Sequence, residues 1–128
     1  MDDMTRCTEL VRGATLAAVA IMICASSALA HCFPDQMIPS EASALAAAPP
    51  QVVMHFDNQF NPAESSVRVL NEKGDIVSGP GTPSADARTI TAPLKWLAPG
   101  QYFVKWRATS RDGDHTLGAY SFTVKGAR

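Results

Sequence analysis

From residue 51 onwards, the chain consists of short segments in which apolar and polar residues alternate. A period of two places successive side chains on opposite faces of a β-strand. In residues 51–56 one face carries Val52, Met54 and Phe56. The same pattern predicts further strands at residues 65–70, 75–77, 89–91, 101–109 and 119–125. Their apolar faces hold Val67 and Val69, then Tyr102, Val104 and Trp106, and finally Tyr120, Phe122 and Val124.

Turn-forming sequences separate these segments, at residues 71–74, 78–83, 98–100 and 111–113. Short strands at this spacing predict an all-β fold, an antiparallel Ig-like or Greek-key β-sandwich of about seven short strands. The alanine-rich stretch at residues 40–48 lies between Pro39 and the pair Pro49-Pro50. Because proline disfavours helix at both ends of this stretch, we expect a loop there.

The first thirty residues are typical of a signal peptide. Residues 14–25 form a continuous apolar run that is too short to span a bilayer, and small residues follow it up to Ala30. The segment before the run is acidic if translation begins at Met1, whereas a start at Met4 would remove Asp2 and Asp3. Both start sites stay open. We predict a signal peptide at residues 1–30 and one β-sandwich domain at residues 31–128.

The predicted mature domain is small and neutral. It keeps 98 of the 128 residues, with nine of the eleven basic and nine of the twelve acidic side chains. This balance gives no electrostatic footprint for nucleic acid. No second apolar stretch reaches span length, so we expect no direct membrane insertion after cleavage and a soluble protein outside the cytoplasm.

Cys32 is the only cysteine left after cleavage, so no internal disulfide is possible. Residues 29–32 also resemble a lipoprotein signal, in which a lipidated Cys becomes the first residue. Such signals need a small residue just before the Cys, and His31 is not small. Lipidation would remove His31.

Cleavage after Ala30 would make His31 the first residue of the mature protein. Its free α-amine and its imidazole then lie on one residue and can chelate one metal ion. A signal peptide cut just before a His rarely has a packing reason, so we interpret His31 as a candidate metal ligand.

Residues 97–113, with the sequence LAPGQYFVKWRATSRDG, and the following stretch through Gly118 to Val124 resemble the closing half of CopC-type copper resistance proteins. The front half is also similar, with His31, the pair Ile38-Pro39, and a strand that ends in His55-Phe56. The resemblance implies a periplasmic copper-binding β-sandwich that is not an enzyme. It also implies an inner-membrane copper transport protein as a partner.

The resemblance further implies a Cu(II) site with three kinds of ligand: the amino-terminal His, an acidic residue after the strand at 51–56, and an Asp-x-His pair before the last strand. His31 matches the first ligand. The acidic position aligns with Asn58, which is not an anionic ligand, although Asp57 lies next to it.

In the Asp-x-His pair, Asp112 matches the Asp. Counting back from Gly118, the position of the His is occupied by Asp114, and His115 lies one residue later. Cupric ion favours a square of nitrogen and oxygen donors. The amine and imidazole of His31, together with His115 and either Asp112 or Asp114, would supply such a set if the loop shifts by one residue.

Each candidate ligand also has a purely structural interpretation. Asp112-Gly113-Asp114 is a common turn sequence, and His115 suits an exposed loop. His55 is expected to be a surface strand residue outside the site. Cys32 is either a small buried residue or a ligand for cuprous ion. Residues 69–81 contain no Met, so we expect no methionine-rich cuprous site of the family type.

Three classes of function therefore stay open. The first is a periplasmic protein that holds Cu(II) for copper resistance or homeostasis, or for transfer to a membrane partner. The second is an interaction domain of the same fold that has lost metal binding. The third, a copper monooxygenase, needs a broad sugar-binding face that 98 residues scarcely allow.

Overall fold

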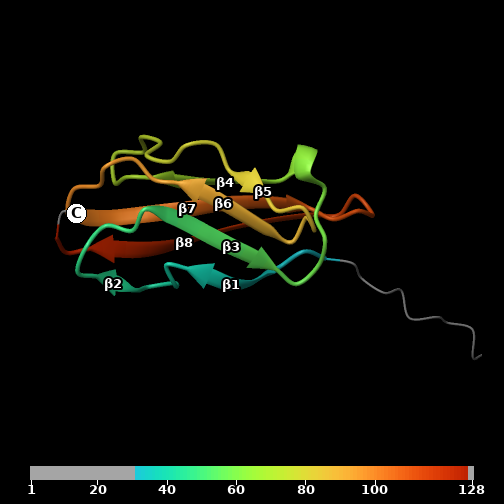
Figure 1. Cartoon of the computed structure of the whole chain (residues 1–128), viewed down its shortest axis with the longest axis horizontal. Coiled ribbons are helices and arrows are strands. Elements are labelled where there is room, and N and C mark those ends of the chain that lie inside the picture. The colour runs from blue at the N-terminus through green and yellow to red at the C-terminus, as the bar shows by residue number, and fades with distance from the viewer. Residues whose placement is uncertain (1–30, 127–128) are drawn as a thin grey trace, which may run out of the picture.

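The computed structural model describes residues 31–126 and forms a sandwich of two four-stranded sheets (Figure 1). The first sheet has the order β1 (Pro34–Ile38), β3 (Gln51–Phe56), β6 (Thr89–Pro93) and β5 (Thr82–Pro83). The second has the order β2 (Ala44–Leu45), β8 (His115–Val124), β7 (Gly100–Thr109) and β4 (Ser66–Leu70). A short 3-10 helix, η2 (Pro62–Glu64), precedes β4. The predicted all-β sandwich is confirmed.

The core lies between the two sheets and is built from the faces that the alternation predicts. Val52, Met54 and Phe56 of β3 are fully buried. The inward side chains of the second sheet are buried or partly buried, and they are Val67, Val69, Tyr102, Val104, Trp106, Tyr120, Phe122 and Val124. The long β7–β8 hairpin pairs without interruption from Gly100 with Val124 to Thr109 with His115.

Three strands form where the sequence does not predict them, and the shortest of these, β5, lies within the turn expected at residues 78–83. The loop expected at residues 40–48 contains β2, which pairs in parallel with β8. The Ser43 carbonyl accepts from the Thr123 N–H, and the Lys125 N–H donates to Leu45. The backbone groups along the edge of β8 therefore form hydrogen bonds with this stretch, although alanine has a low strand propensity. In the same way, β1 covers the edge of β3.

The strand predicted at residues 75–77 does not form. Ile76 makes only an isolated bridge with Leu70, and Ser78 makes one with Leu94. The last strand is longer than predicted, because it starts at His115 rather than at residue 119. His115 is therefore a strand residue whose direction is set by its pairing with Thr109, and it is not a loop residue that can shift freely.

Three segments meet at one end of the sandwich in Figure 1: the start of the described chain, the β3–β4 connection with η2, and the β7–β8 loop. The end of β8 lies at the opposite end. Within residues 31–126 the structure contains no helix of the length and apolar character that crossing a bilayer requires. The predicted signal peptide, its cleavage site and the choice between Met1 and Met4 fall outside the described residues.

Candidate metal centre

The segment that carries His31 is fixed on both sides by hydrogen bonds. On one side the Thr116 hydroxyl of β8 donates to the Cys32 carbonyl at 2.6 Å. On the other, the Phe33 N–H donates to Asp57 Oδ1 at 2.9 Å, and the Asp57 N–H donates to the Phe33 carbonyl at 2.9 Å. These bonds hold His31 between the β3–β4 connection and the start of β8.

His31 itself has an unused nitrogen. Its Nδ1 is buried and finds no hydrogen-bond partner among the described residues. The nearest carboxylate oxygen recorded is Oδ2 of Asp114, at 3.9 Å, which is too long for a hydrogen bond. The imidazole packs edge-on against Phe33, with ring centroids 5.8 Å apart. Since a buried ring nitrogen without a partner is costly, this arrangement suits a nitrogen that binds a metal ion.

Asp114 is placed by the turn between β7 and β8. The Ser110 N–H donates to the Asp114 carbonyl at 2.8 Å, and the Asp114 N–H donates to the Ser110 hydroxyl at 3.2 Å. Gly113 has a φ of 89°, which a residue with a Cβ rarely adopts. This tight turn places Asp114 Oδ2 3.9 Å from His31 Nδ1, and Asp114 is the residue for which the resemblance implies the family His position. Asp112 lies on the same turn and is exposed.

His115 is held by a different contact. Its Nδ1 lies 2.8 Å from the hydroxyl of the buried Thr109, which also lies 3.2 Å from the Glu64 carbonyl. A carbonyl can only accept, so a hydroxyl that donates to Glu64 accepts from His115 Nδ1–H. Nε2 then keeps its lone pair, as in metal-bound His residues whose other nitrogen is hydrogen-bonded. The exposed ring is thus oriented by Thr109.

Asn58 and Asp57, at and next to the acidic position that the resemblance implies, both make structural hydrogen bonds. Asn58 Oδ1 accepts from the Gln59 N–H at 2.9 Å and stabilises the turn after β3. Asp57 has one carboxylate oxygen bound to Phe33. Within residues 31–126, no three His, Cys, Asp or Glu side chains lie together in an arrangement that could hold a metal ion. The fold therefore brings His31 and Asp114 together, while Asp57, Asp112 and His115 are not gathered with them into one cluster.

Cys32 is completely buried. Its thiol donates to the Gln59 carbonyl, with the sulfur 3.2 Å from the oxygen. Burial and, secondly, the negative charge of Asp57 raise the pKa of the thiol, against a smaller opposite effect of Arg88. Of the two interpretations of Cys32, these contacts support the small buried residue.

His55 lies on the outer face of β3, as expected of a surface strand residue, and its Nδ1 is 2.6 Å from Asp35 Oδ1. Sequence reasoning missed this pair, because β1 was not predicted. It also missed Thr109 and Thr116, which position His115 and His31. No local signal marks these threonines, since their partners are known only once the strands are paired.

The structure defines a small β-sandwich with a candidate metal centre at one end. The chain belongs to the CopC family, because the CopC domain model matches residues 35–125. The predicted resemblance is confirmed.

Related proteins and structures agree with this assignment. Copper resistance protein C of Xanthomonas campestris pv. juglandis is 30% identical over 120 residues, covering 87% of this chain and 93% of the relative. Protein YobA of Escherichia coli K12 is 28% identical over 113 residues, covering 86% and 91%. The crystal structure of CopC from Methylosinus trichosporium OB3b matches with a TM-score of 0.70 and 35% identity, covering 75% of this chain and 95% of the other. PcoC of Escherichia coli, described as a methionine-rich copper resistance protein, matches with a TM-score of 0.65 and 29% identity, covering 75% and 100%.

Proposed function

We propose that this protein binds Cu(II) in the periplasm through His31, after removal of residues 1–30, and serves copper resistance or homeostasis. Membership of the CopC family and the names of the relatives support copper as the metal. The observation that carries the proposal is the buried Nδ1 of His31, which has no partner among the described residues and lies 3.9 Å from Asp114. Bonds from Thr116 of β8 and from Asp57 after β3 hold its segment in place. Copper is cargo in this proposal, and no catalytic step is involved.

The ligand chemistry follows from the residues at this end of the sandwich. A free α-amine and the Nδ1 of the same His would form one chelate ring on the metal, and Asp114 would add an oxygen. His115 through Nε2, Asp112, Asp57 or water would complete the square that Cu(II) prefers. Because imidazole nitrogens must be unprotonated to bind, the affinity is expected to fall as the solution becomes acidic.

The copper would then pass to a partner, for which an inner-membrane copper transport protein is our proposal. A site open at one end of the sandwich suits transfer, because His31 and Asp114 keep 36% and 50% of their side-chain surface exposed. Release of a fully enclosed ion would require the fold to open locally.

A second candidate function is an interaction domain that has lost metal binding. Two observations favour it: Asn58 stands at the acidic position, and the described residues contain no ready cluster of three ligand side chains. In that case the sandwich would serve only to bind another protein.

Titration with Cu(II) separates the two functions. One protein begins at His31 and the other carries a single Gly ahead of it, and both are followed by electron paramagnetic resonance. Tight binding with nitrogen-rich hyperfine structure in the first and much weaker binding in the second would support the copper protein. Equally weak signals in both would favour the interaction domain.

Variants then assign the ligands. Asp114→Asn and His115→Gln should each weaken binding if the residue is a ligand, and His55→Gln is the matched control because His55 pairs with Asp35 outside the site. Amino-terminal sequencing of the exported protein tests the cleavage. Any first residue other than His31 would contradict the proposed chelate.

A further inference from the structure

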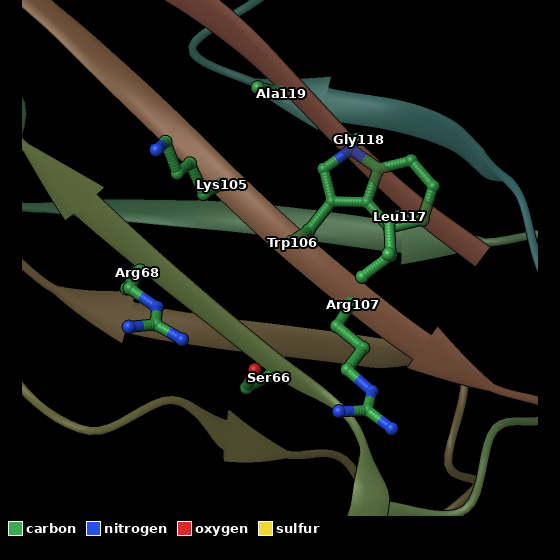
Figure 2. Close-up of a pocket in the computed structure, with 8 residues that line it drawn as sticks. All are labelled: Ser66, Arg68, Lys105, Trp106, Arg107, Leu117, Gly118 and Ala119. Carbon is green, nitrogen blue, oxygen red and sulfur yellow. The ribbon is translucent and has the colours of Figure 1, made fainter. Parts of the chain in front are cut away.

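The outer face of the second sheet carries a groove that the candidate copper site does not use (Figure 2). Its volume is about 660 Å³, and residues of β4, β7 and β8 line it. Its lining combines small residues, among them Ser66 and Ala119, with the long side chains of Arg68, Lys105 and Arg107. Leu117 of β8 is 73% exposed at its rim. The groove therefore offers charged and apolar contacts at once.

Three of the lining side chains are cations that have no carboxylate partner in the described part of the chain. Arg68 of β4 and Lys105 of β7 lie directly opposite each other in the sheet, and Arg107 follows on β7 opposite Ser66. Within residues 31–126, the recorded close pairs of basic and acidic side chains both involve His, so no carboxylate lies within 4.0 Å of these three cations. Like charges opposite each other destabilise a sheet, and the exposed face could hold neutral residues instead. This arrangement costs stability, so we look for its use in binding.

The groove also ends close to the candidate copper site. Leu117 and His115 lie two residues apart on the same exposed face of β8, and on β7 Arg107 lies two residues before the buried Thr109 that contacts His115. Two residues of a strand span about 7 Å. A segment that extends about two residues beyond the groove along β8 would therefore reach His115.

We propose that this groove binds an acidic, extended polypeptide segment. The segment belongs to the protein that exchanges copper with this one, and this identity of the partner rests on the proposed function. Carboxylates of such a segment would pair with Arg68, Lys105 and Arg107, and an apolar residue would pack on Leu117. An extended segment that crosses β4, β7 and β8 would contact the three cations and Leu117. Residues 31–126 as a whole do not favour binding to a bilayer of acidic lipids, since they carry nine acidic against eight basic side chains.

The test uses the metal-free protein beginning at His31 and a fluorescent ten-residue oligoglutamate peptide. Binding should weaken as salt is added, because exposed charges are screened. The charge reversal Lys105→Glu should weaken binding about tenfold, whereas the matched reversal Lys95→Glu, outside the groove, should change it less than about twofold. Lys105→Glu should also raise Tm, because it places a carboxylate opposite Arg68. Loss of binding together with higher stability excludes misfolding as the cause.

Three results would overturn the proposal: no measurable peptide binding, equal loss in both variants, or phosphatidylglycerol vesicles binding more tightly than the peptide and depending on Lys105. A Cu(II) titration of the same variants keeps this test separate from that of the copper site. Normal copper binding by Lys105→Glu, with peptide binding lost, supports the groove. Peptide binding by a protein that fails to bind copper would refute the proposed function and leave an acidic-peptide site.

Discussion

Replacing Gly118 by Ala tests the packing of the β7–β8 hairpin. Gly118 lies opposite Trp106 on the inward face, and the indole covers the place where a Cβ would be. A Cβ built on Gly118 would lie 2.4, 2.6 and 2.7 Å from three atoms of that ring. The ring has little freedom to move away, because it packs against the core and meets Phe56 edge-on, with centroids 5.8 Å apart.

The expected effect has the opposite sign to that of an ordinary Gly→Ala change. In a strand without a clash, Ala is favoured over Gly by about 0.5–1 kcal/mol. Here the added methyl overlaps the indole by about 1 Å relative to normal carbon contacts, and overpacking of this kind costs about 1–3 kcal/mol. We expect a net loss of about 1–2 kcal/mol, which in a domain of this size lowers Tm by about 4–16 °C.

Thermal and denaturant unfolding, followed by circular dichroism, would measure this loss. The control is a double-mutant cycle with Trp106→Leu, which removes the ring that the Cβ would meet. In the Trp106→Leu background, Gly118→Ala should be neutral or slightly stabilising. A stabilising effect in the wild-type background, or an equal loss in both backgrounds, would refute the proposed clash between Gly118 and Trp106.

Four further predictions concern three buried polar groups. The Tyr120 hydroxyl is buried without a partner in the described structure. Tyr120→Phe should therefore leave the free energy of unfolding unchanged or raise it by up to about 1 kcal/mol. A lower free energy of unfolding in chemical denaturation would contradict this. Burial raises the pKa of Tyr120 to about 12, above its ordinary value near 10. The protonated hydroxyl therefore contributes fully to the stability of the fold below about pH 10, and this contribution is lost as the pH rises through 12. Tyr120→Phe should therefore reduce the loss of stability between pH 10 and 12, and an unchanged alkaline profile would contradict this. The Cys32 thiol, with its raised pKa and complete burial, should react with a thiol reagent at least about a hundredfold more slowly in the native than in the unfolded protein, and fast native labelling would disprove its burial. Thr116→Val removes the hydrogen bond to the Cys32 carbonyl and should weaken Cu(II) binding several-fold, while Thr123→Val, a half-buried position at the far end of the same strand, should leave it unchanged.

The candidate site shows how far reasoning from the sequence reaches. His31 and Asp114 could be named as candidates, because a predicted cleavage site marks the first and the spacing implied by the family resemblance marks the second. Their proximity could not be deduced, since it depends on bonds that join Cys32 to Thr116 and Phe33 to Asp57, across 84 and 24 residues. The proposal that a loop shift would bring His115 into the place of the family His is not supported by the fold, because strand pairing fixes His115 opposite Thr109.

By itself the sequence determined which face of the main predicted strands enters the core, because alternation along a strand is a local property that burial between two sheets favours. It did not predict loop residues of the core such as Phe60 and Leu97. It also determined the family, through a run of residues in the closing hairpin. Only the tertiary structure decided that residues 34–38 and 44–45 complete the sheet edges, and that Arg68 stands opposite Lys105. Edge pairing and cross-strand contacts depend on which backbone groups remain unpaired and on the register of distant strands, and no short stretch of sequence carries that information.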